Sequence, residues 1–308
     1  MDNNRHIGSL LGLAIGDALG APLEFSKPGT FHPINDFQSG GMFKLNAGEW
    51  TDDTSMALCL ADSLIRCNGF DAKDQIETYL KWLEEGYMSV RNKAVGVGKT
   101  TMRAIVRFKK SREPYSSITN PMSAGNGSIM RLAPVPIFYA SDPLKAITMS
   151  GESSKTTHAL QVNIDTCKYF GGLIWGALNG IGKEQLLSNH YSPIKEYREN
   201  FDMVPDLKLV ASGSFKEKNP PEIVGSGYVV KSIEAALWAF IKSDTFEEGI
   251  LKAVNLGDDA DTTGAVFGQL AGAYYGIDGI PGRFKQKVAK KELIISFAEK
   301  LYNSHTIY

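Results

Sequence analysis

The sequence predicts an all-α fold that forms a single domain over residues 1–308. Apolar residues recur at steps of three and four along most of the chain, and this spacing lines one face of a helix. Alternating apolar and polar runs bounded by turns, the pattern of half-buried strands, are almost absent. Long helical patterns continue on both sides of every loop without a change in composition, so we expect no domain boundary.

The first helix is predicted near the N-terminus and ends before Pro22. Its apolar face consists of Ile7, Leu10, Leu11, Ala14, Ile15 and Ala18. A neighbouring stripe holds Gly12, Gly16 and Gly20. Because small residues at this spacing let two backbones approach closely, we expect this helix to pack directly against another one.

The remaining helices follow in order, and several carry start and stop signals. One begins near Thr51, and the next is capped by Asp71 and stopped by Gly86. Another starts at Asp142-Pro143, with proline in its first turn. Further helical patterns cover residues 99–110, 157–180, 229–243, 245–256, 260–275 and 284–302. The loops rich in glycine, proline and serine are 26–50, 111–128 and 203–227, the last being the best linker candidate.

Composition excludes several classes of protein. Hydrophobic residues make up 43% of the chain, and the formal net charge is −1, so charge gives no general attraction to nucleic acid or to an anionic membrane. The most apolar stretches, around residues 173–178 and 266–275, are too short to span a bilayer. The three cysteines form no zinc-binding pattern. Their low number and the polar N-terminus indicate a cytoplasmic protein.

Two acidic segments stand where loops lead into predicted helices. Residues 50–55 contain the adjacent pair Asp52 and Asp53, and residues 257–264 contain three aspartates within four positions. Helix capping is the structural alternative, since an Asp in a first turn contributes about 0.3–1 kcal/mol. Capping needs only one side chain, whereas carboxylates about 4 Å apart repel by about 4 kcal/mol at an effective dielectric constant of about 20. Crowded carboxylates and hydroxyls therefore favour a hard cation such as Mg²⁺ or Mn²⁺.

Three other features are candidates for chemistry, each with a structural alternative. Glu24 follows the first helix, where a carboxylate can orient water or act as a base, unless it is simply a solvated loop residue. The glycines that flank Asn126 expose backbone N–H groups suited to phosphate, although Gly-Asn-Gly is also a common turn. His158 is placed at the start of the predicted 157–180 helix, where a lone histidine is more often a packing or capping residue.

Six segments, in this order, resemble the ADP-ribosylglycohydrolases of the dinitrogenase-reductase-activating type. They are GDALGAPLEF (16–25), WTDDTSMAL (50–58), GNGSIMRLAP (125–134), TTH (156–158), GSGYVVKSIEAALWAF (225–240) and GDDADTTGA (257–265). The similarity extends over about residues 5–300. It implies a compact, orthogonal all-α bundle with two adjacent divalent ions, Mg²⁺ or Mn²⁺, in a central cleft.

The resemblance also implies roles for particular residues. The metal ligands would be Thr51, Asp52, Asp53, Asp259, Asp261 and Thr262. The catalytic residues would be Glu24, Asp53 and Asp259. The substrate would contact Gly125, Asn126, Gly127, Ser128, His158, Gly227 and Tyr228. Asp258 falls just outside the matched positions.

The implied activity is removal of ADP-ribose from an arginine or serine side chain of a protein, or from a related small conjugate, by a monomeric enzyme. One segment departs from the family pattern. Relatives that act on ADP-ribosyl-arginine often carry an Asp in a D-I-G-N-T-T-like segment, and Gly96 takes that position here. This departure favours the alternative of a regulatory or immunity protein that binds ADP-ribose with weak or no turnover. The intact set of metal ligands favours the enzyme.

Overall fold

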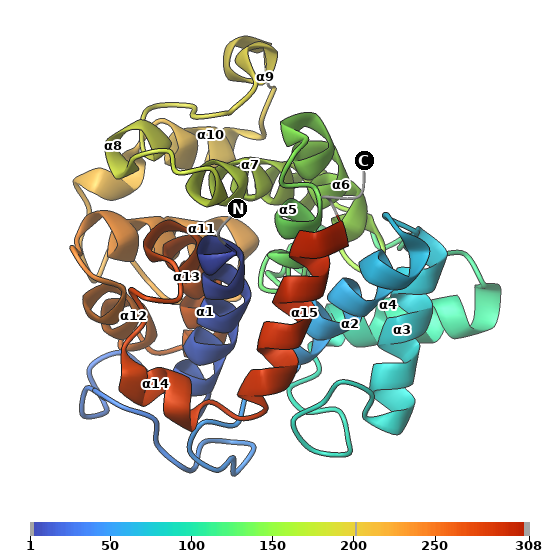
Figure 1. The fold of residues 1–308 in the computed structure, drawn as a ribbon, viewed down its shortest axis with the longest axis horizontal. Coiled ribbons are helices and arrows are strands. Elements are labelled where there is room, and N and C mark those ends of the chain that lie inside the picture. The colour runs from blue at the N-terminus through green and yellow to red at the C-terminus, as the bar shows by residue number, and fades with distance from the viewer. Residues whose placement is uncertain (1–2, 201, 305–308) are drawn as a thin grey trace.

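The computed structural model describes residues 3–200 and 202–304, and its regular elements are helices (Figure 1). Within these residues no β-strand occurs, and sheet-like pairing is limited to isolated bridges. The first half of the chain holds α1 (Asn4–Gly20), η1 (Ala21–Leu23), α2 (Asp52–Cys67), α3 (Ala72–Glu85), α4 (Lys99–Ser111), η2 (Pro121–Ser123), α5 (Pro134–Phe138) and α6 (Pro143–Lys155). The second half holds α7 (Gln161–Leu178), α8 (Lys183–Leu186), α9 (Lys195–Asn200), α10 (Pro205–Ala211), η3 (Ser214–Lys216), α11 (Val229–Ile241), α12 (Phe246–Val254), α13 (Ala260–Tyr275), α14 (Gly282–Lys287) and α15 (Lys291–Ser304).

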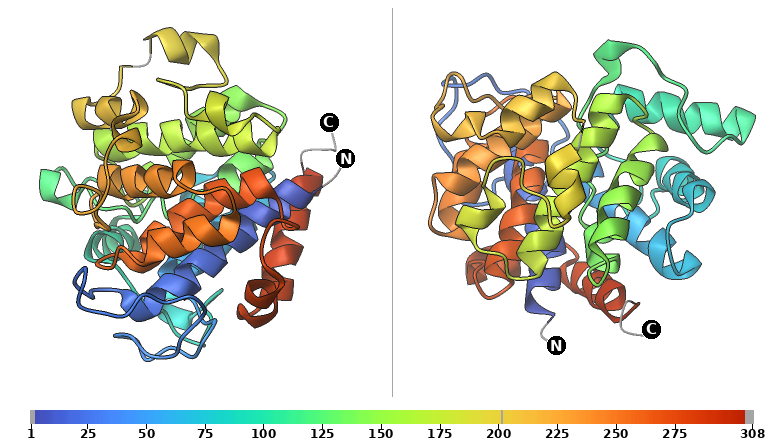
Figure 2. Two further views of the ribbon diagram at one scale, coloured as in Figure 1. Left: turned by 90° about the vertical axis from the view of Figure 1, so that its left-hand side faces the viewer. Right: turned by 90° about the horizontal axis from the view of Figure 1, so that it is seen from above.

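The centre of the fold is the antiparallel pair α1 and α13, which run side by side through the molecule (Figure 2). Small residues face each other at every turn of this pair. A Cβ atom on Gly12 would lie 2.3 Å from the carbonyl oxygen of Gly268, and one on Gly16 would lie 2.1 Å from that of Gly264. No side chain fits at these distances, so the two backbones touch. This contact confirms the close packing that the glycine stripe predicted.

Helix α1 is almost wholly buried. The segment Asn4–Leu23 is long and apolar enough to cross a membrane by length and composition, yet 94% of its apolar window is buried inside the fold. This helix is not one of the two stretches, 173–178 and 266–275, that were predicted to be the most apolar. In this structure α1 packs against α13, α15, α2 and α7, so its apolar residues build the core.

Most helix boundaries agree with the predictions, and the predicted caps are present. The Asp71 side chain accepts a hydrogen bond from the Asp74 amide at the start of α3, and Gly86 ends that helix with a left-handed backbone. The Asp142 side chain likewise accepts from the Lys145 amide at the start of α6. These local signals were readable because each involves residues only three or four positions apart.

Three predictions about the elements were wrong. The pattern at 284–302 forms two helices, α14 and α15, because the backbone between them is hydrogen-bonded to the 26–50 loop. The Ala289 amide donates to the Gly48 carbonyl, and the Ala289 carbonyl accepts from the Trp50 indole. His158 does not open α7, because its amide donates to the Ser154 carbonyl and so closes the last turn of α6. The 203–227 segment is no open linker, since it forms α10 and η3, with a buried Leu207 and Phe215.

Candidate active site

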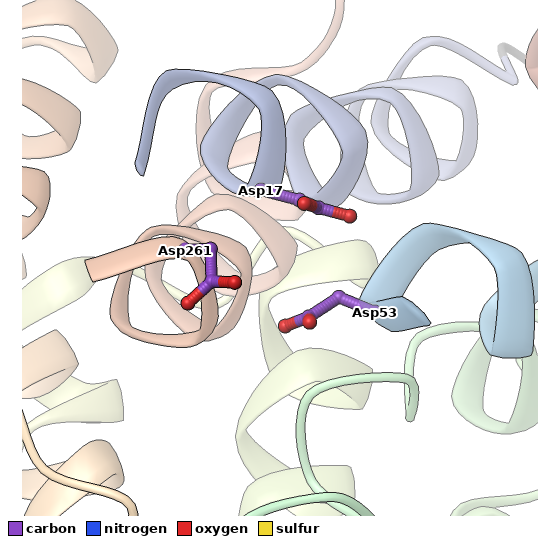
Figure 3. Close-up of side chains that lie close together, drawn as sticks. All are labelled: Asp17, Asp53 and Asp261. Atoms are coloured by element: carbon purple, nitrogen blue, oxygen red, sulfur yellow. The ribbon is translucent and has the colours of Figure 1, made fainter. Parts of the chain in front are cut away.

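Three helix ends meet at one point in the interior. Asp17 lies near the end of α1, Asp53 in the first turn of α2, and Asp261 in the first turn of α13. Figure 3 shows their three carboxylates pointing toward one another. The convergence follows from the antiparallel α1–α13 pair, which sets the end of one helix beside the start of the other. The N-terminal ends of α2 and α13 also favour negative charge.

The carboxylates form two overlapping groups, within each of which one oxygen per residue lies within 4.8 Å of the others. One group is Asp17, Asp53 and Asp261, and the second is Glu24, Asp259 and Asp261. Asp261 belongs to both. The fold therefore brings together the two acidic segments, 50–55 and 257–264, which are about 200 residues apart in the sequence.

Burial and mutual repulsion raise the pKa of these acids. Burial raises the pKa of Asp53 and Asp261 well above the usual range, and neighbouring carboxylates raise it further. Burial, with the charge of Asp259, raises the pKa of Glu24 to about 8. Two oxygens, Asp53 Oδ1 and Glu24 Oε2, are buried without a hydrogen-bond donor among the described residues. Buried anionic oxygens of this kind require either protons or cations, so the donor set fits a hard divalent metal ion.

Asp17 has a different role, and the sequence analysis missed it. Its two oxygens accept from the amide and hydroxyl of Thr51 and from the amide and hydroxyl of Thr54, at 2.6–3.0 Å. These four donors saturate a carboxylate. Asp17 therefore orients the first turn of α2, on which Asp52 and Asp53 stand. The sequence signal was a single carboxylate inside an apolar helix, but its partners lie more than 30 residues further along.

A cavity of about 420 Å³ opens over the carboxylates. Eleven of the candidate residues line it, namely Glu24, Asp52, Asp53, Gly125, Asn126, Gly127, His158, Gly227, Asp259, Asp261 and Thr262. The remaining lining residues are Phe25, Gly96, Gly98, Lys99, Thr100, Thr101 and Met130. Sequence reasoning missed Phe25, whose ring is 59% exposed. The cavity thus has an acidic floor and a rim with apolar and cationic side chains.

Three candidate residues do not line this cavity. The Thr51 hydroxyl donates to Asp17 at 2.8 Å. Ser128 is buried beside Cys167. The Tyr228 hydroxyl donates to Asp206 at 2.9 Å, and burial raises the pKa of this tyrosine to about 12. Asp258, which the family match left out, is also absent from both carboxylate groups and from the cavity lining.

The Gly-Asn-Gly loop is tied to the acidic floor through its central residue. The Asn126 side-chain amide donates to Asp259 at 2.6 Å and to the Ser232 hydroxyl at 2.9 Å. The Asn126 backbone amide donates to the Gly227 carbonyl at 3.0 Å. One N–H group that was expected to face phosphate is therefore bonded within the protein. Contact between the rest of this loop and phosphate stays a prediction.

His158 is held as a neutral ring by a short chain of hydrogen bonds. The buried Arg131 guanidinium donates to the Thr157 hydroxyl at 2.7 Å, and that hydroxyl lies 2.8 Å from His158 Nδ1. Because arginine can only donate, Thr157 accepts from Arg131, and the proton of its hydroxyl is available for Nδ1. A neutral ring that accepts at Nδ1 carries its hydrogen on Nε2, which lies beside Gly125 and Gly127 of the cavity loop. Burial and the Arg131 charge lower the pKa of His158 to about 3.

We expect the His158 ring to remain neutral, with hydrogen on Nε2, from about pH 8 down to about pH 5. An exposed imidazole takes a proton near pH 6.5. Nitrogen–proton correlation spectra over this range, assigned with His158→Gln, measure both the tautomer and the titration. A midpoint between about pH 6 and 7, or a signal for hydrogen on Nδ1, would contradict the prediction. Because the folded pKa is lowered, the stability that His158 contributes is present above about pH 6.5 and falls as the pH drops toward 3.

Gly96 occupies a position that favours glycine. Its φ is +82°, and a Cβ atom there would lie 2.4 Å from Asp52 Oδ1. Any side chain would be strained and would displace Asp52. At Gly96, where the sequence departs from the family pattern, the backbone therefore has a conformation that suits glycine, and it lies against Asp52.

The fold and the site define the class of protein: an all-α protein with a cavity built on clustered carboxylates. The sequence profile of the ADP-ribosylglycohydrolase family matches residues 2–306, and the chain belongs to this family. It is accordingly an enzyme that removes ADP-ribose from a conjugate by hydrolysis.

Relatives of established name agree with this assignment. The chain is 38% identical to the ADP-ribosylarginine hydrolase Tri1 of Serratia proteamaculans, over 96% of this chain and 78% of the relative. It is 30% identical to the ADP-ribosyl-[dinitrogen reductase] glycohydrolase of Rhodospirillum rubrum, over 94% of this chain and 92% of the relative. A solved structure described as an ADP-ribosylglycohydrolase-related protein complex superposes with a TM-score of 0.86 at 41% identity, covering 98% of each chain.

Proposed function

We propose that this enzyme hydrolyses the bond between ADP-ribose and an arginine side chain of a modified protein, and that it uses two divalent ions, Mg²⁺ or Mn²⁺. The observation that carries the proposal is the pair of carboxylate groups that share Asp261. The arginine linkage is supported by relatives named ADP-ribosylarginine hydrolase at 38% and 39% identity. The intact acidic floor favours turnover over the alternative of an ADP-ribose-binding regulatory or immunity protein.

The residues that would hold the ions are those with free carboxylate oxygens around Asp261. Asp53 and Asp261 would hold one ion, and Glu24, Asp259 and Asp261 the other, with Asp52 and Thr262 beside them. When bound, the ions would neutralise the carboxylates, bind the ribose hydroxyls and lower the pKa of a water molecule. Asp17 has no free lone pair, so its part is to fix the turn that carries Asp53.

The side chains around the cavity supply binding, orientation and proton transfer. Water would form a bond to the anomeric carbon of the ribose while the bond from that carbon to the guanidine nitrogen breaks. The leaving nitrogen keeps the electron pair, and the carboxylate oxygen of Glu24 that does not hold the ion accepts the proton that the water loses. His158 Nε2–H is placed to donate to an oxygen of the substrate, and Asn126 holds Asp259 in position. The developing positive charge on the ribose suits the acidic floor.

Addition of Mn²⁺ or Mg²⁺ is expected to stabilise the folded protein and to switch on its activity. Only the folded chain assembles the carboxylates. An ion at about a hundred times its Kd therefore raises the free energy of unfolding by about 2.7 kcal/mol for each site. The measurements are the melting temperature and the release of free ADP-ribose from arginine-, serine- and O-acetyl-linked substrates, with each ion and with chelator. Full turnover in excess chelator would refute the metal requirement. Binding of ADP-ribose without release from any substrate would favour the regulatory alternative.

The proposal also includes the monomeric state and the cytoplasmic location that the sequence analysis expected. All three cysteines are free, and Cys59 and Cys167 are buried. Free thiols are typical of a reducing compartment.

A further inference from the structure

Helix α4 carries a concentration of positive charge. Within Lys99–Ser111 it has basic residues at five positions and no acidic residue, in a chain whose formal net charge is −1. Its buried face consists of Thr101, Ala104, Ile105 and Phe108. The basic residues therefore gather on the side of the helix that faces away from the core.

The exposed side of α4 is also partly apolar. Met102 is 37% exposed and Val106 is 41% exposed. These two residues line a shallow surface groove together with Arg103, Arg107, Lys110 and Ser111. Methionine and valine on a solvated helix face, bordered by cations, are typical of a surface that contacts another molecule.

This surface is continuous with the active-site cavity. Lys99, Thr100 and Thr101 at the start of α4 line the cavity. Lys99, Arg103, Val106 and Lys110 are spaced by four, three and four residues, so they follow one face of the helix. At 1.5 Å per residue, the stripe runs for about 16 Å from the rim of the cavity along the surface.

The cations of the stripe have no acidic partners within the protein. Among residues 3–200 and 202–304, no carboxylate lies within 4.0 Å of the charged groups of Lys99, Arg103 or Lys110. Lys109, on a different side of the same helix, is by contrast paired with Glu84 at 2.5 Å. The stripe therefore presents uncompensated positive charge beside the place where the substrate enters.

We propose that this face of α4, defined by Lys99, Met102, Arg103, Val106 and Lys110, is the docking surface for an acidic segment of the ADP-ribosylated protein. The segment would flank the modified arginine, its carboxylates would pair with Arg103 and Lys110, and one apolar side chain would rest on Met102 and Val106. The inference deepens the proposed function and rests on it. An extended segment rises about 3.3 Å per residue. The stripe, about 16 Å long, would therefore hold about five residues of the segment, counted from the modified arginine.

Synthetic peptides test the proposal. One peptide carries a single ADP-ribosyl-arginine flanked on each side by six Asp and Glu residues, the second carries Gln at those positions, and free ADP-ribosyl-arginine is the third substrate. For the wild-type enzyme with Mn²⁺, we expect kcat/KM to be about tenfold higher for the acidic peptide than for the Gln peptide. The advantage should shrink as salt is added, because charge pairs on a surface are screened.

The variant Arg103→Glu/Lys110→Glu should lose this advantage while its kcat/KM on free ADP-ribosyl-arginine stays within about twofold of wild type. Neither residue lines the cavity. Lys242→Glu/Lys300→Glu, which makes the same change of charge at two exposed positions after α11 and on α15, is the matched control and should keep the preference. Unchanged activity on free ADP-ribosyl-arginine also shows that the variant is folded.

Several outcomes would overturn the docking surface. The first is an equal kcat/KM of the wild type on the two peptides. The second is an equal loss of kcat/KM on all three substrates in the double variant. The third is a double variant that keeps the peptide preference but loses binding to duplex DNA or to phosphatidylserine vesicles. A wild-type enzyme that cleaves free ADP-ribosyl-arginine without any flank preference refutes the docking surface alone. A wild-type enzyme that cleaves none of the three refutes the proposed function itself.

Discussion

Replacement of Asp261 by Asn is expected to abolish most of the activity and to stabilise the metal-free protein. Asp261 belongs to both carboxylate groups, and its pKa is raised first by burial and then by Glu24, Asp53, Asp259 and Asp17. Asn keeps the shape and the oxygen near the Thr262 amide, but it removes the charge. Changes even in the outer shell of a metal site cost about tenfold to a hundredfold, so a loss of at least this size is expected.

Asp258 and Asp259 provide the comparison within the same segment. Asp259→Asn should lose activity as Asp261→Asn does, because Asp259 is a member of the second group. Asp258→Asn should stay within about twofold of wild type: it lies outside both groups, and its φ of 51° is one that Asn tolerates. Turnover, Mn²⁺ affinity by calorimetry and melting temperature with and without Mn²⁺ are measured for all three. If Asp258→Asn were the most damaging, the assignment of ligands would be off by one residue.

The largest effect on stability is expected for Gly16→Ala. The added Cβ would lie 2.1 Å from the carbonyl oxygen of Gly264, with backbone atoms on both sides and no flexible side chain to move. Helices α1 and α13 would have to separate, and Asp17 and Asp261 would separate with them. Overpacking of a core costs about 1–3 kcal/mol and sometimes more; we expect about 3 kcal/mol or more here, or failure to fold.

Gly172→Ala in α7 is the matched control. Gly172 is also a buried helical glycine, but a Cβ there would meet its nearest neighbour, Pro193, at an ordinary 3.4 Å. Alanine inside a helix is favoured over glycine by about 0.5–1 kcal/mol, so this variant should be slightly more stable than wild type. Urea unfolding of both variants measures the contrast. Equal stability of Gly16→Ala and Gly172→Ala would refute the close contact between α1 and α13.

Sequence reasoning succeeded where the cause of a structure is local. Apolar periodicity identified the long helices, and caps such as Asp71 and Asp142 act on amides three residues away. The glycine stripe of α1 predicted a close contact because only backbone fills such a gap. The acidic residues were found because repulsion between neighbouring carboxylates is itself a sequence feature.

Sequence reasoning failed where the cause lies far along the chain. The role of Asp17 depends on hydrogen-bond donors of Thr51 and Thr54, and no residue near Asp17 in the sequence indicates these partners. The break before α15 depends on Ala289, whose amide donates to the Gly48 carbonyl and whose carbonyl accepts from the Trp50 indole. The neutral state of His158 depends on burial and on the charge of Arg131, which lies on another segment. Each is a tertiary contact between particular residues, and local sequence patterns do not identify the distant partner.

The union of α1 with α13 has a consequence for how the protein is made. On the ribosome, the first helix emerges more than 230 residues before its partner. At about 5–20 residues per second, its apolar surface remains without α13 for about 12–50 seconds. During that interval a segment of transmembrane-like length and apolarity is exposed in the nascent chain. The carboxylate cluster can form only after this interval, because Asp259 and Asp261 are synthesised at its end.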